Sequence, residues 1–93
     1  MTTSDRPEDR PTRLKRLRFR CWHRGIKEAD VLLGNFADKK MAALDDGQLD
    51  RLEVLLEEQD IDLVAWIGSV RPAPDHLDSD VMTLLRKLDY LDR

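Results

Sequence analysis

The sequence contains few residues that could bind a metal, form a disulfide or cradle a phosphate. Its one cysteine, Cys21, excludes an internal disulfide and is compatible with a reducing compartment. Cys21, His23 and His76 supply only one close pair of soft ligands, so no zinc site is expected. The four glycines are isolated from one another and form no phosphate-binding loop. We therefore expect no metal ligands, no cofactor-binding residues and no catalytic residues, and we interpret Cys21 as a core side chain.

Long apolar runs are also missing. The longest is the stretch 63–67, whereas a membrane-spanning helix needs roughly 20 apolar residues. No apolar stretch precedes Leu14, which argues against a secretory signal, and three acidic residues among the first nine argue against a transit peptide. These features predict a protein without membrane insertion, located in a bacterial-type cytoplasm.

The chain is short, and its charge is unevenly divided. Its 93 residues allow one small domain, too small to enclose a spacious catalytic cavity. Residues 1–27 hold nine Lys/Arg against three Asp/Glu, and residues 28–93 hold seven against sixteen. The net charge of −3 thus hides a basic head of +6 on an acidic body of −9. Such asymmetry concerns partners more than fold.

Apolar residues recur at helical spacing along most of the chain, and sustained alternation of period two is absent. The pattern predicts an all-α fold, a compact bundle of about five short helices. The expected helices cover residues 13–23, 27–41, 45–57 and 60–70, with a fifth from about 75 or 78 to 90. We expect the chain to be a monomer. Residues 1–12, which contain two prolines and no apolar periodicity, are expected to form a flexible arm before a single domain at 13–93.

Local signals mark some of the helix boundaries. Asp45 is expected to cap the third helix, with Gln48 as its partner in a capping box, and Asp60 is expected to cap the fourth. Gly34 has no local reason to stand inside a helix, and close helix approach is the usual cause of such a glycine. Trp22 is open to two interpretations, a core residue or a partly exposed anchor for a partner.

A cationic stripe lies along one side of the first expected helix. It consists of Arg13, Arg16, Arg20, His23 and Arg24. The stripe can be a solvated face that compensates the acidic body, a surface for an acidic protein, or a nucleic-acid contact. Because the domain is acidic overall and lacks a nucleic-acid motif, we expect no nucleic acid to bind. A small helical adaptor that binds nucleic acid or an acidic partner through Arg13, Arg16 and Arg20 remains the alternative function.

The window from Arg24 to Glu28 carries the most chemical information. Arg24 can donate a bidentate fork to a carboxylate or phosphate, and Gly25 lets another backbone approach closely. Glu28 can accept from a partner's donors or pair with Arg24 across the turn. From the residues alone, a glycine hinge flanked by an internal ion pair is favoured over a contact site.

The pattern Arg24-Gly25-x-x-Glu28, followed by Asp30 and Leu32-Leu33, resembles the signature of a known family. The family is that of the succinate dehydrogenase assembly factors, which promote covalent attachment of FAD to the flavoprotein subunit. The similarity runs from Arg18 to about Leu88. It includes the segments 44–46, 55–57 and 62–66.

The resemblance implies a five-helix bundle that acts as an assembly chaperone and is not an enzyme. It implies that Arg24, Gly25 and Glu28 contact the partner, with Asp30 and His23 as secondary contacts. The implied partner is the flavoprotein subunit of succinate dehydrogenase, and also that of fumarate reductase. No cofactor is expected to be stably bound, because the factor acts on the FAD of its partner.

Overall fold

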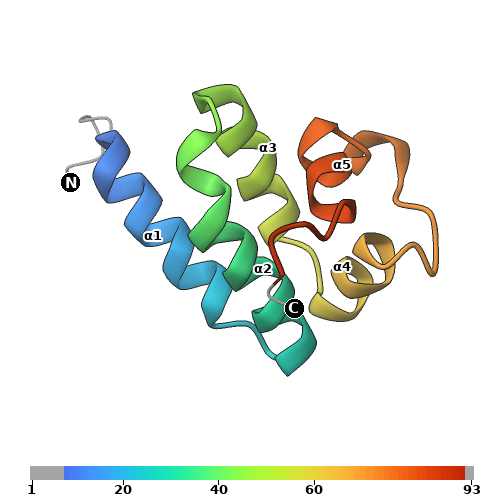
Figure 1. Cartoon of the computed structure of the whole chain (residues 1–93). Coiled ribbons are helices and arrows are strands. Elements are labelled where there is room, and N and C mark those ends of the chain that lie inside the picture. Colours follow the sequence, from blue (N-terminus) through green and yellow to red (C-terminus); the bar gives the residue numbers. More distant parts are fainter. Residues whose placement is uncertain (1–7, 92–93) are drawn as a thin grey trace.

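A computed structural model describes residues 8–91, and in this range the chain forms helices joined by loops, without a strand (Figure 1). The elements are α1 (Arg10–Trp22), α2 (Lys27–Lys39), the 3₁₀ turn η2 (Met41–Ala43), α3 (Asp46–Leu56), α4 (Asp60–Ile67), the 3₁₀ turn η3 (Asp75–Leu77) and α5 (Asp80–Arg86). The predicted all-α bundle is confirmed. α1 packs along α2 and also contacts α3, α4 packs against α2, and α5 contacts α2, α3 and α4. None of the described helices is long and apolar enough to cross a lipid bilayer.

The first helix begins earlier than the sequence pattern predicts. The Asp9 carboxylate accepts a hydrogen bond from the backbone N–H of Thr12 at 2.9 Å and so caps the helix. Pro11 lies in the first turn, where its missing N–H removes no helical hydrogen bond. The proline that suggests a flexible arm is therefore a helix-starting residue.

Arg10 ties this first turn to the segment after α2. Its guanidinium donates to the carbonyl oxygens of Ala42 at 3.0 Å and Leu44 at 2.5 Å. Residues 10–12, assigned to the arm by the sequence pattern, thus belong to α1 and contact the bundle. Asp9 of the predicted arm is the N-cap of α1, and residues 1–7 lie outside the described residues.

The starts of α3 and α4 test the two predicted caps. Asp45 accepts from the backbone N–H of Gln48 at 2.8 Å, and the Gln48 side chain accepts from the N–H of Asp45 at 2.9 Å, so the capping box is confirmed. The cap predicted at Asp60 is wrong. Gln59 occupies the N-cap position without a side-chain bond, and Asp60 is the first helical residue of α4. Its carboxylate points instead to the loop that follows α1.

The last helix is shorter than the expected range 75–90. It ends at Arg86, and Leu88 adopts a left-handed backbone with φ of 56°. The chain then turns so that Tyr90 is fully buried, where its hydroxyl donates to the Leu85 carbonyl at 2.7 Å. The Tyr90 ring meets Phe36 edge-on, with centroids 5.3 Å apart. The segment after α5 thus closes the core, although no helical periodicity predicts it.

Gly34 lies directly under the indole ring of Trp22, at the point where α1 crosses α2. A Cβ atom at this position would stand 2.2 Å from the ring, so only glycine fits. The Trp22 indole N–H also donates to the Asp38 carboxylate at 3.3 Å. Close helix approach therefore explains the glycine, and Trp22 packs within the protein.

The Cys21 thiol is expected to be unreactive in the folded protein. Cys21 is fully buried in the core, and burial raises the pKa of its thiol to about 12. The thiolate is the reactive form, so iodoacetamide at pH 8 should label the native chain at least ~100-fold more slowly than the chain unfolded in guanidinium. Mass spectrometry of timed samples measures both rates. Native labelling at the unfolded rate would contradict the core placement.

Candidate functional site

The loop between α1 and α2 is held in place by two carboxylates. One oxygen of Asp60 accepts from Nε of Arg24 at 2.7 Å, and its other oxygen accepts from the backbone N–H of Gly25. Asp30, in the first turn of α2, accepts from the backbone N–H of Arg24 at 2.6 Å. A further bond joins the Arg24 guanidinium to the Glu58 carbonyl at 3.2 Å. The loop is therefore fixed both to its own following helix and to the start of α4.

Arg24 is not the exposed donor fork that the sequence suggests. Its side chain is only 10% exposed and that of Asp60 is 17% exposed. The expected pairing of Arg24 with Glu28 does not form, because Asp60 takes the guanidinium. Burial of the Asp60 carboxylate opposes its ionisation, but hydrogen bonds from Arg24 and from the Gly25 N–H outweigh burial and hold the pKa of Asp60 below its usual value.

The outward face of the loop is formed by Gly25, Ile26, Lys27 and Glu28, which are all exposed. Within residues 8–91, the Glu28 carboxylate makes no hydrogen bond or ion pair. Glu28 stands in the first turn of α2, where the helix dipole favours a negative charge. The Glu28 carboxylate and the nearby Gly25 backbone, which no side chain covers, are thus both available to another molecule.

The two secondary candidates, Asp30 and His23, shape the loop. Asp30 is half-buried and already holds the Arg24 backbone. His23 is exposed; its Nδ1 lies 2.8 Å from the Phe19 carbonyl oxygen and its ring stacks on Phe19 with centroids 3.8 Å apart. The structure thus brings all five predicted residues into one loop and its flanks. The structure also adds Asp60 to the site. This residue is far from the loop in the sequence, and the sequence pattern identifies it only as a helix cap.

Arg13 and Arg16 of the cationic stripe face acidic residues of α3, and Arg20 faces the residue that directly follows α3. Arg13 pairs with Glu53 at 2.8 Å and with Asp50 at 2.6 Å. Arg16 pairs with Glu53 at 3.1 Å and also with Glu8, while Arg20 pairs with Glu57 at 2.7 Å. The basic head thus neutralises part of the acidic body within the same chain. Each of these three arginines is already paired with a carboxylate, so none offers an unpaired guanidinium for the alternative adaptor function.

The ion pairs of Arg13 and Arg16 with Glu53 form a charged seam between α1 and α3. Replacement of Glu53 should show that this seam stabilises the fold in a pH-dependent way. The Arg16 guanidinium, together with that of Arg13, holds the pKa of Glu53 below its usual value although burial opposes it. A depressed carboxyl pKa stabilises the fold above the unfolded pKa, and this stabilisation is lost as pH falls through the folded pKa. Glu53→Gln should therefore cost about 1 kcal/mol, or about 5 °C in Tm, at pH 7.

The cost should vanish once the wild-type carboxyl is protonated. Thermal unfolding of both proteins at pH 7 and near pH 3 measures the difference. Asp75→Asn is the matched control, because its carboxylate is exposed and makes no hydrogen bond or ion pair among the described residues. A cost of Glu53→Gln that is equal at both pH values would show that the seam contributes through shape rather than charge.

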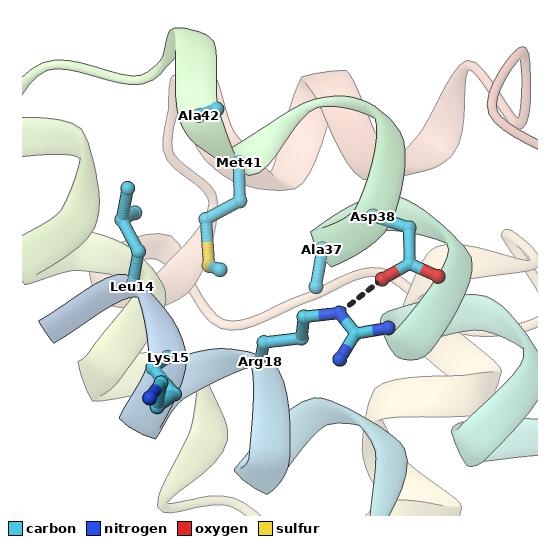
Figure 2. Close-up of a pocket in the computed structure, with 7 residues that line it drawn as sticks. All are labelled: Leu14, Lys15, Arg18, Ala37, Asp38, Met41 and Ala42. Carbon is cyan, nitrogen blue, oxygen red and sulfur yellow. Dashed lines mark hydrogen bonds and ion pairs between the residues drawn. The ribbon is translucent and has the colours of Figure 1, made fainter. Parts of the chain in front are cut away.

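Figure 2 shows a hollow between α1 and α2 on another part of the surface, with a volume of about 410 Å³. It is lined by Leu14, Lys15, Arg18, Ala37, Asp38, Met41 and Ala42. Nε of Arg18 donates to Asp38 at 2.5 Å, so these two charged residues of the hollow already pair with each other. In the part of the chain that the structure describes, no three His, Cys, Asp or Glu side chains gather as a metal site. The loop after α1 remains the best candidate site.

The chain is similar to known proteins over most of its length. The family described as "Flavinator of succinate dehydrogenase" matches residues 15–89. A Meyerozyma guilliermondii protein named "Succinate dehydrogenase assembly factor 2, mitochondrial" is 40% identical over 84 residues, covering 86% of this chain and 62% of the relative. An Acetobacter pasteurianus protein named "FAD assembly factor SdhE" is 35% identical over 63 residues, covering 68% of this chain and 58% of the relative.

These relatives are longer than this chain and correct one prediction. A Dictyostelium discoideum relative, 32% identical over 72 residues, is covered over 51% of its length and 77% of this chain. The chain thus spans between half and two thirds of the length of these three relatives. The predicted bacterial-type cytoplasmic location is wrong, since the Meyerozyma and Dictyostelium relatives are both named as mitochondrial. Early acidic residues and a missing apolar stretch do not fix a compartment.

Proposed function

The chain belongs to the family of flavinators of succinate dehydrogenase, and from this premise we propose that it binds the flavoprotein subunit of succinate dehydrogenase and promotes covalent attachment of FAD to that subunit. The family match over residues 15–89 carries the proposal, because it includes the whole loop from Arg24 to Glu28 and the helices that hold it. The fixed loop and the unpaired Glu28 carboxylate support a role in binding another protein.

In this proposal the chain acts as a chaperone and not as an enzyme. The FAD and the histidine that bonds to it belong to the flavoprotein subunit, and the chain itself holds no cofactor. It would bind before the iron–sulfur subunit docks and favour one arrangement of the flavoprotein's domains. Such a shift requires tighter binding to that arrangement than to others. A domain of 93 residues that lends a surface is suited to this task.

The predicted contact residues divide into two groups by exposure. Gly25 and Glu28 are exposed and would meet the flavoprotein subunit directly. Arg24 is largely covered, so its contribution would come through the shape of the loop that it holds with Asp60. Asp30 would act in the same way from the other side, and His23 would contact the partner at the edge of the loop.

The test is reconstitution with purified components. The flavoprotein subunit is mixed with FAD in the presence or absence of the chain. Covalent flavin is then measured by fluorescence of the denatured subunit. We expect the chain to raise the yield and Glu28→Ala to lower it at least about fivefold, because it removes a charged contact. Asp75→Ala, which removes an exposed carboxylate from η3, should not change it. A yield independent of the chain would refute the proposal.

The same assay distinguishes the finer choice of partner. The flavoprotein subunit of fumarate reductase replaces that of succinate dehydrogenase under identical conditions. We propose that the chain accepts both, and a rise in covalent flavin on only the succinate dehydrogenase subunit would restrict it to one. Sedimentation of the chain alone tests whether it works as a monomer.

A further inference from the structure

An apolar groove adjoins the candidate site and has no role in it so far. Its volume is about 480 Å³. The walls come from α2, α4 and the segments after α4 and α5, which Figure 1 shows together at one end of the bundle. Its walls include Val31, Val64, Val70 and Leu88, and Lys27 and Glu28 lie at its rim. The groove therefore begins where the outward face of the loop ends.

The apolar side chains of this groove are unusually exposed. Val70 is 79% exposed and Val31 is 39% exposed. Ile26, directly before the rim residue Lys27, and Ile61, three residues before the wall residue Val64, are also exposed. Contiguous exposed apolar surface on a small domain marks an interaction site, because water contact with it is unfavourable.

The backbone around the groove is strained as well. Ser69 and Leu88 are the two residues other than glycine with positive φ in residues 8–91, at 61° and 56°. Leu88 lines the groove, and Ser69 stands between the lining residues Gly68 and Val70. A side chain with a Cβ adopts this conformation at a cost. Each of the two residues directly follows the C-cap of a helix, where a left-handed residue commonly ends the helix, so both walls begin at a helix end.

We infer that the groove receives an apolar segment of the flavoprotein subunit, with a basic residue of that segment facing Glu28. The inference rests on the proposed function, since it names a second part of the surface used by the same partner. Glu28 belongs to both the exposed loop and the groove rim, so a partner bound at Gly25 and Glu28 lies over the groove mouth. A charged rim around an apolar centre is the usual anatomy of a protein–protein contact.

The test uses the full chain and the purified flavoprotein subunit of succinate dehydrogenase. Val70→Asp places a carboxylate in the groove at a position exposed enough to leave the fold unchanged. We expect it to weaken binding at least tenfold by titration calorimetry, because a bound apolar segment would bury an unpaired charge. Val70→Ala should weaken binding only a few fold. Val54→Asp, at an exposed valine of α3 outside this groove, should bind like the wild type.

The outcomes separate this inference from the function on which it rests. If the wild type binds and Val70→Asp binds equally well with an unchanged Tm, the groove inference is overturned and the proposed function stands. If the wild type does not bind, the proposed function fails and the inference with it. A concentration-dependent dimer of the chain that Val70→Asp abolishes would assign the groove to a second copy instead. Val31→Ser, tested in parallel, should also weaken binding.

Discussion

Gly25→Arg is expected to abolish binding of the flavoprotein subunit while leaving the bundle folded. A Cβ at position 25 would lie 3.0 Å from the Asp60 carboxylate that accepts from the Gly25 N–H, so this tight contact must relax by a few tenths of an ångström. The new side chain would also stand on the exposed face that the partner must approach. We expect at least a ~100-fold loss of affinity, about 2.7 kcal/mol, and no rise of covalent flavin.

Calorimetric titration against the flavoprotein subunit and covalent flavin on the denatured subunit measure the effect. Gly47→Arg is the control, because it adds the same side chain to the first turn of α3, at the other end of the bundle (Figure 1). Circular dichroism and Tm establish that both variants fold. Wild-type affinity in Gly25→Arg, or loss of the helical signal, would contradict a steric block at the loop.

Gly34→Ala should be the most destabilising of the four possible glycine-to-alanine substitutions. The added Cβ would stand 2.2 Å from the Trp22 ring, so the two helices must separate or the indole must leave its place and its bond to Asp38. Overpacking of this kind costs about 2–3 kcal/mol, which lowers Tm by about 10–20 °C in a domain of this size.

A double-mutant cycle isolates the contact between the two helices. In a Trp22→Ala background the same methyl group has no ring to meet, so Gly34→Ala should cost little there. Gly47→Ala is the second control, because its Cβ would meet its neighbours at ordinary distances of 3.4 Å or more. It should raise stability by about 0.5–1 kcal/mol, as Ala does in helices. A destabilisation by Gly34→Ala that persists without Trp22 would refute the packing argument.

Signals that act within one turn of helix can be read from the sequence. The capping box of Asp45 and Gln48 is an example, since the two partners lie three residues apart and both of their bonds form although the Gln48 side-chain N–H also donates to Asp80. The apolar stripe of α1 that faces the core is also predicted from the sequence, and its members Leu17 and Cys21 are both fully buried. Gly34 stands out in the sequence as an anomalous helix residue, although spacing alone does not identify its partner Trp22.

Interactions between distant segments cannot be read in this way. Asp60 has the local features of a cap, but Arg24 and Gly25 compete for its carboxylate from 36 and 35 residues away. The ion pairs between Arg13 and Glu53 span 40 residues and turn an apparent solvent face into a helix contact. Sequence reasoning therefore finds the candidate loop, but its assignment of Arg24 as an exposed donor is not supported.

The two carboxylates around the loop have a consequence for the entropy of association. Arg24 and Gly25 each donate a backbone N–H to a carboxylate, so this surface loop is ordered before any partner arrives. Ordering a flexible loop on binding costs free energy that must be subtracted from the affinity. The loop after α1 has little conformational freedom left to lose, and its amide protons should exchange slowly with solvent although the loop is exposed.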